Sequence, residues 1–178
     1  MKFLRQLSSP WVNWLVSQWR TGRTEHNSDT TRSKSRGLAA VELVARFIYS
    51  RNYMNKSHAR PKPGAFYPPP DDQLSVVHTT GLADSDVWEI GRLHALGSEP
   101  PRDKIHGRAD LPVKALIDRK LRAIRDDNPF ERHTSVVDWP QSSDPDERKQ
   151  QRTLICLELS QDPAVRLVVP ESPIVYSS

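Results

Sequence analysis

From residue 74 to residue 169, segments with the two-residue period of a strand alternate with segments that have the longer period of a helix. This order restricts the fold more than any other feature of the chain. The expected strands are Leu74–Thr80, Lys104–Leu111, Leu121–Arg125, Thr134–Trp139 and Val165–Val169, and the expected helices cover 82–96, 112–120 and 144–160. Such an order predicts an α+β domain built on a single mixed sheet of four or five strands with flanking helices.

Two segments before residue 74 have other patterns. A further helix is expected over 38–50, where Leu38, Val41, Val44 and Ile48 recur every three to four residues. Residues 51–72 contain five prolines between positions 61 and 70, which are incompatible with a helix or a central strand. We interpret 51–72 as an extended, partly polyproline segment that wraps a domain of residues 37–170, and 171–178 as a tail.

The first 20 residues predict a short amphipathic helix, with Ser9 as its cap and Pro10 in its first turn. Three tryptophans share one side of this helix: Trp11, Trp14 and Trp19. A helix this short is marginal in water, so it is expected to lie on its own domain, in a partner's groove or on a membrane surface. Residues 21–36 have no large apolar side chain and predict a flexible linker.

Charge is divided unevenly along the chain. Residues 1–62 carry a net charge of +9, whereas residues 63–178 carry a net charge of −5. A basic N-terminal arm beside an acidic body is typical of a protein that meets nucleic acid or an acidic protein partner. Candidate anion contacts in this arm, interleaved with aromatic residues, are Arg51, Arg60 and Lys62. Alternatively, the basic segment packs on the chain's own acidic domain.

The chain has one cysteine, Cys156, so an intramolecular disulfide is impossible and no disulfide partner is expected. It lies in an apolar helical run and is expected to be a buried, inert thiol, which fits a reducing compartment. No segment approaches the roughly 20 apolar residues of a membrane span, and the N-terminus has no continuous apolar signal core. We therefore expect a cytoplasmic protein.

One group of candidate catalytic residues lies in Lys104–Pro112. Side chains alternate along a strand, so His106, Arg108 and Asp110 are expected to share one face. These residue types can supply an acid/base, an anion clamp and an orienting carboxylate. The alternative is a solvated strand face with an Arg–Asp ion pair.

A second group lies in Glu131–Pro140, where Arg132 and His133 enter a strand. If this strand pairs with 104–111, His133 lies near His106, and two histidines with an acid can pass protons or bind a metal. No ligand motif such as HExxH occurs, so we expect neither a metal nor a cofactor. No serine has a GxSxG or SxxK context, so a serine nucleophile is not expected.

Four segments together resemble small bacterial proteins of unknown function that share this layout over about residues 40–170. They are Arg60–Pro68 (RPKPGAFYP), Leu74–Val77 (LSVV), Gly107–Leu111 (GRADL) and Arg132–Pro140 (RHTSVVDWP). The resemblance implies a bacterial or phage source and no mechanism. Residues 1–36 lie outside it.

These observations give two functional hypotheses. The first is a non-catalytic accessory protein whose basic N-terminal third contacts nucleic acid or an acidic protein, since no catalytic motif is present. The alternative is a small enzyme that acts on a nucleotide or another phosphorylated small molecule. In that case Arg108 and Arg132 bind the anion, His106 or His133 is the acid/base, and Asp110 orients it.

Overall fold

The computed structural model describes residues 35–55, 60–97, 102, 104–171 and 174–175. The tryptophan-bearing helix expected at 1–20 lies outside them, as does the expected linker apart from its last two residues. The chain divides into two compact units, Met1–Arg32 and Ser33–Ser178, and all described residues belong to the second.

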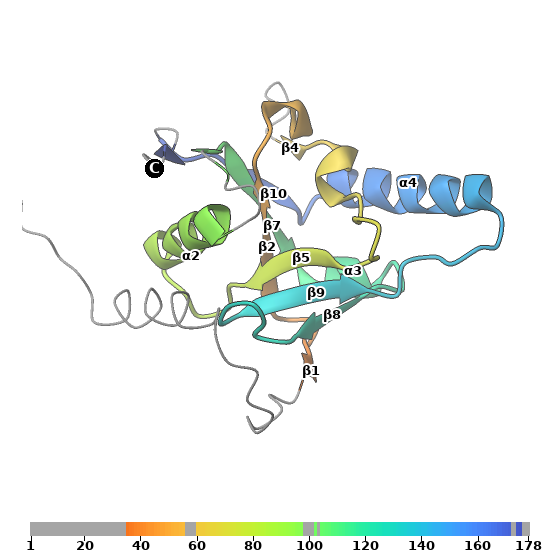
Figure 1. Ribbon diagram of the computed structural model, residues 1–178, viewed down its shortest axis with the longest axis horizontal. Helices are drawn as coiled ribbons and strands as arrows, with labels where there is room; N and C mark the ends of the chain where they lie inside the picture. Colours follow the sequence, from red (N-terminus) through yellow and green to blue (C-terminus); the bar gives the residue numbers. More distant parts are fainter. Residues whose placement is uncertain (1–34, 56–59, 98–101, 103, 172–173, 176–178) are drawn as a thin grey trace, which may run out of the picture. The chain divides into compact units, whose positions relative to one another are not determined.

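The described domain is α+β, as the sequence predicts, and it is built around a seven-stranded antiparallel sheet (Figure 1). In spatial order the strands are β1 (Arg36–Gly37), β8 (Arg122–Arg125), β9 (His133–Val137), β5 (Leu74–His78), β2 (Leu43–Ile48), β7 (Gly107–Pro112) and β10 (Arg166–Val168). The expected mixed sheet of four or five strands is therefore wrong in strand number and direction. The short strand β1 and the unrecognised strand β2 account for the additional members.

Three α-helices and two 3₁₀ turns accompany the sheet: α2 (Asp84–Gly97), α3 (Val113–Ile117), α4 (Pro145–Gln161), η1 (Arg51–Tyr53) and η2 (Pro63–Phe66). Two small sheets pair β3 (Met54–Asn55) with β4 (Arg60–Pro61) and β6 (Lys104–Ile105) with β11 (Ile174–Val175). Strand β11 lies in the segment expected to be a tail, so that expectation is wrong for Ile174 and Val175. Within the segment expected to wrap the domain, 51–72, the described residues include η1, η2 and the β3–β4 pair.

The large sheet consists of two halves that meet over very few residues. Strand β2 pairs with β5 only at Val44–His78 and Ala45–Val77, whereas it pairs with β7 along its whole length. Beyond Ala45 the two strands diverge, and β5 continues beside β9. Figure 1 shows the result, in which β2 and β7 cross the direction of β5 and β9.

Residues 43–48 form this central strand rather than the expected helix. Apolar side chains fill both of its faces, with Val44 and Ile48 on one and Ala45 and Phe47 on the other. A strand buried on both sides lacks the alternation of a half-exposed strand, so its apolar residues recur at spacings that also suit a helix. Val41, which completed the helical pattern, is 87% exposed.

The main hydrophobic core lies between one face of the sheet and α4, α3 and η2. Its fully buried side chains include Phe66 of η2, Leu159 of α4 and Trp139, whose indole N–H donates to the Val136 carbonyl at 3.0 Å. Cys156 also lies in this core, and burial raises the pKa of its thiol to about 12. The sequence prediction of a buried thiol is confirmed.

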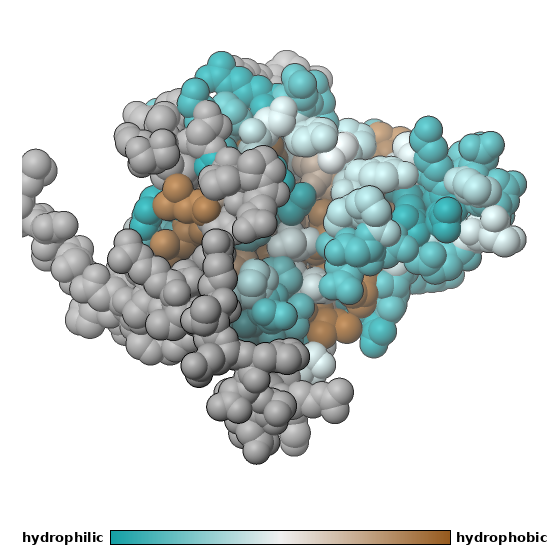
Figure 2. Space-filling view, in the orientation of Figure 1, coloured by the Kyte–Doolittle hydropathy of each residue, from teal (hydrophilic) through white to brown (hydrophobic). Residues whose placement is uncertain are grey.

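Helix α2 covers the opposite face of the sheet, where Trp88 lies against Phe47 with ring centroids 6.2 Å apart. Gly91 allows this close approach, since a Cβ atom there would stand 2.6 Å from Cζ of Phe47. Figure 2 shows mainly hydrophilic residues along α4, at the right of the view. No described helix is long and apolar enough to cross a membrane.

We predict that Gly91→Ala destabilises the domain by about 1–3 kcal/mol, because overpacking against a buried ring outweighs the higher helix propensity of alanine. Urea unfolding measures the change. In a Phe47→Leu background the same substitution should cost clearly less, because the clashing ring is absent. An equal cost in both backgrounds would contradict the proposed contact.

Candidate active site

A loop between β8 and β9 brings Asp126 next to His133. The loop starts directly after β8 and ends directly before β9, and the Asp126 N–H donates to the His133 carbonyl at 3.1 Å. Val136 of β9 lies in the core, so the alternation of side chains along the strand places His133 on the opposite side of the sheet, which α2 covers. Asp126 Oδ1 and His133 Nδ1 are 2.5 Å apart.

Ser75 reaches the other nitrogen of the same ring. The Ser75 position on β5 is diagonal to His133 on β9, since Val77 is directly opposite His133. The Ser75 Oγ atom lies 2.9 Å from His133 Nε2. The hydrogen bonds therefore run in the order Ser75, His133, Asp126.

The carboxylate determines which group donates and which accepts in these hydrogen bonds. An ionised carboxylate only accepts, so an imidazole with one N–H at this position donates through Nδ1 to Asp126. Nε2 is then an acceptor, and the hydroxyl of Ser75 donates to it. This is the arrangement in which a histidine can take the proton of a serine that attacks an electrophile.

Further contacts hold Asp126 in this position. Its Oδ2 atom accepts a hydrogen bond of 2.9 Å from the hydroxyl of Ser135, which lies opposite Ser75 on β9. Its Oδ1 atom also accepts from the N–H of Asn128 at 3.4 Å. His133 and Ser135 are buried, whereas Ser75 and Asp126 are half-buried.

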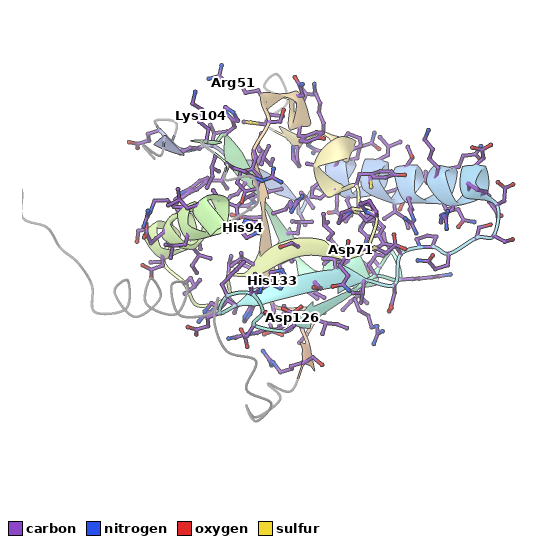
Figure 3. All side chains as sticks on the ribbon, viewed as in Figure 1. Arg51, Asp71, His94, Lys104, Asp126 and His133 are labelled. Carbon is purple, nitrogen blue, oxygen red and sulfur yellow. The ribbon has the colours of Figure 1, made fainter. Side chains whose placement is uncertain are left out.

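Helix α2 places a second histidine beside this group. The Phe130 ring contacts both His94 and His133 edge to face, with centroids 5.2 Å from each. A hydrogen bond of 2.5 Å joins His94 Nδ1 to the hydroxyl of Tyr49. Figure 3 shows His94, His133 and Asp126 following one another from α2 to the β8–β9 loop, while Arg51 and Lys104 lie at the other end of the domain.

The environment of His94 keeps its ring neutral. Burial, together with the positive charge of Arg46 and the proximity of His133 and Arg102, lowers the pKa of His94 to about 4. Arg102 stacks on Tyr49, the hydrogen-bond partner of His94, with its guanidinium carbon 4.4 Å from the Tyr49 ring centroid. His94 is therefore an uncharged, polar ring at neutral pH.

The residues predicted from Lys104–Pro112 form a different cluster. Arg108 and Asp110 share one face of β7, as expected, and are joined by a hydrogen bond of 2.9 Å. Arg108 also pairs with Asp84 of α2 and lies 4.6 Å from the Trp88 ring centroid. Burial lowers the pKa of Arg108, but the two carboxylates outweigh burial and raise it overall.

The structure separates this cluster from His133. Strand β9 pairs with β5 and β8, and both β5 and β2 lie between β9 and β7. The pairing that was to bring His133 beside His106 therefore does not occur. His106 itself lies between β6 and β7, where its N–H donates to the Ile48 carbonyl at 2.9 Å.

The other residues selected from the sequence are scattered. Arg51 and Lys62 are exposed, Arg60 donates to the Gln161 carbonyl at 2.6 Å, and Arg132 donates to the Thr80 carbonyl at 3.2 Å. The tryptophans predicted to bind a partner, Trp11, Trp14 and Trp19, lie outside the described residues. Within the described residues, no group of three or more His, Cys, Asp or Glu side chains could hold a metal ion.

Sequence reasoning found His133 but missed Ser75, Asp126 and His94. One signal for Asp126 was present, because adjacent strands predicted at 121–125 and 134–139 form a hairpin that places residue 126 opposite residue 133. No signal of this kind existed for Ser75, because it meets His133 only through the pairing of β5 with β9, which are distant in sequence.

Comparison with protein-family models found no match for this chain, and searches of curated proteins and of solved structures found none either.

The low pKa of His94 predicts a pH dependence of stability. Between pH 6.5 and about 4 the unfolded chain binds a proton at His94 that the folded protein does not, so the free energy of unfolding falls as the pH falls through this range. The full effect is up to about 3 kcal/mol. His94→Gln should flatten the fall when urea unfolding is measured at several pH values. His78, whose pKa burial also lowers, contributes in the same direction in both proteins. Parallel curves would contradict the prediction.

Proposed function

We propose that this protein is a hydrolase that cleaves an ester through a covalent intermediate on Ser75. The observation that carries the proposal is the hydrogen-bond order Ser75–His133–Asp126, with 2.9 Å between Ser75 Oγ and His133 Nε2 and 2.5 Å between His133 Nδ1 and Asp126 Oδ1. Nucleophile, base and orienting acid of serine hydrolases are recognised by this geometry rather than by sequence order.

In the first step the Ser75 oxygen attacks the carbonyl carbon of the ester while its proton moves to His133 Nε2. The tetrahedral intermediate collapses by breaking the bond to the leaving alkoxide, which takes the proton from His133. Water then attacks the acyl-serine with His133 again as the base, and the acid and free Ser75 are released. Asp126 keeps the imidazole in the required tautomer and stabilises the imidazolium that forms in both steps.

This proposal predicts that a fluorophosphonate probe labels the full-length protein at Ser75, because such probes report a serine activated by a histidine. Ser75→Ala and His133→Gln should abolish labelling and lower the hydrolysis of p-nitrophenyl acetate by about 10³-fold or more. Intact-mass spectrometry after labelling, with peptide mapping, gives the modified residue.

Ser160→Ala is the matched control, because it removes a buried serine from α4, on the other side of the sheet. It should leave labelling unchanged. Thermal unfolding of each variant separates loss of chemistry from loss of folding. An unlabelled wild-type protein, or labelling that persists in Ser75→Ala, would mean that the three residues only hold the β8–β9 loop on the sheet.

We also propose, as a second function, that the basic N-terminal third binds nucleic acid or an acidic protein. The supporting observation is the net charge of +9 over residues 1–62. Within the described part of that segment, Arg51 and Lys62 are exposed and take part in no ion pair with another described residue. Such side chains are available to phosphate groups.

For this second function we predict binding of the full-length protein to duplex DNA or RNA that weakens steeply between 50 and 200 mM salt, with log K falling by about 0.9 for each phosphate contact. Arg51→Glu with Lys62→Glu should reduce the salt slope by about 1 for each lost contact. Truncation to residue 62 is unsuitable, since it removes β1 and β2. Lys149→Glu with Arg166→Glu gives the same charge change elsewhere and should have little effect. Salt-independent binding, or equal effects of the two pairs, would contradict the proposal.

A further inference from the structure

Arg46 lies where the two halves of the sheet separate. It follows directly after Ala45, the last residue of β2 that pairs with β5. Its side chain bridges the gap through hydrogen bonds from Nη1 to the Ser75 carbonyl at 2.9 Å and from Nε to the Ala65 carbonyl at 3.3 Å. The guanidinium is therefore bonded to the residue that we propose as the nucleophile.

Arg46 forms no ion pair with any described residue. Several arginines that cross-link other parts of the domain meet a carboxylate, among them Arg108, Arg119 and Arg152, whereas Arg60 and Arg132 donate to main-chain carbonyls as Arg46 does. Burial lowers the pKa of Arg46 and the positive Arg102 lowers it further, while Tyr49 and Tyr53 act in the opposite direction. An arginine side chain nevertheless stays charged in proteins, so this half-buried cation lacks a counter-charge within the described residues.

The hydrogen-bonding capacity of Arg46 is also incompletely used. A guanidinium has five N–H donors, and only one on Nη1 and the one on Nε have acceptors among the described residues. Both donors on Nη2 have no acceptor among the described residues, and an N–H of this kind can bind an oxygen of a carboxylate or a phosphate. The neutral His94 and the positive Arg102 nearby add no carboxylate that would compete with such a ligand.

We infer that Arg46 binds the anionic group of the substrate, so that the ester attacked by Ser75 carries a carboxylate or a phosphate. This inference rests on the proposed hydrolase function and adds the substrate class. The anion supplies a counter-charge that no described residue provides to the half-buried guanidinium, and Arg46 holds it beside β5. Esters without a negative charge leave Arg46 unpaired and are the poorer substrates.

The test compares two esters of similar size on the full-length protein, the anionic p-nitrophenyl hemisuccinate and the neutral p-nitrophenyl butyrate. We expect kcat/KM to favour the anionic ester by about 10- to 100-fold, the range for a hydrogen bond to a charged group. Arg46→Gln should remove this preference by lowering kcat/KM for the anionic ester alone, and Arg46→Lys should retain part of it. Arg148→Gln, which removes a positive charge from α4, should leave the preference intact.

Because Arg46 joins two strands, a second measurement on the wild-type protein tests the inference independently of whether Arg46→Gln folds. Succinate and inorganic phosphate should each slow fluorophosphonate labelling of Ser75, and the stronger of the two identifies which anion the site prefers. If Ser75 is labelled but the protein neither prefers the anionic ester nor is protected by anions, the role of Arg46 is overturned and the hydrolase proposal stands. Absence of labelling at Ser75 would overturn the hydrolase proposal and, with it, this inference.

Discussion

The brief pairing of β2 with β5 determines the arrangement of this domain. Two residues of each strand join the half-sheet of β1, β8, β9 and β5 to the half-sheet of β2, β7 and β10. Elsewhere along these strands the backbone groups facing the gap need partners from side chains, because an unpaired buried carbonyl is costly. The guanidinium of Arg46 meets this need at Ser75, and it also donates to the Ala65 carbonyl of η2. Because of the same divergence, the backbone of Ser75 is hydrogen-bonded on its β2 side to the Arg46 side chain and not to another strand.

One face of the sheet packs against the hydrophobic core, and the other face holds the hydrogen-bonded group of Ser75, His133 and Asp126. Leu74 and Val76 of β5 enter the core beneath α4, while Ser75 between them points to the α2 side. The strict two-residue alternation of a strand separates these roles within three consecutive residues. Helix α2 approaches this face closely at Gly91, and one turn later it presents His94 to Tyr49 and Phe130.

Local patterns predict most of the elements after residue 74, because the helices there have clear ends and the strands between them are short apolar runs. They fail at residues 43–48, where burial on both faces removes the alternation, and at Ile174 and Val175, whose strand exists only through pairing with β6. The candidate site shows the same limit. His133 is conspicuous as a residue type, and Asp126 follows from hairpin geometry, but Ser75 reaches them through a contact between segments 58 residues apart. Local patterns contain no information on which distant strands become neighbours.

The outer strands of the large sheet are very short. Strand β1 covers two residues of one edge and β10 three residues of the other. Exposed sheet edges are templates on which another chain can add a strand, and brief edges with charged residues restrict such growth. Arg36, which is paired with Glu42, lies on one of these strands and Arg166 on the other, and neither strand offers more than three residues for pairing. Edges this short give a second molecule little backbone to pair with, which disfavours open-ended assembly even though the sheet is not closed into a barrel.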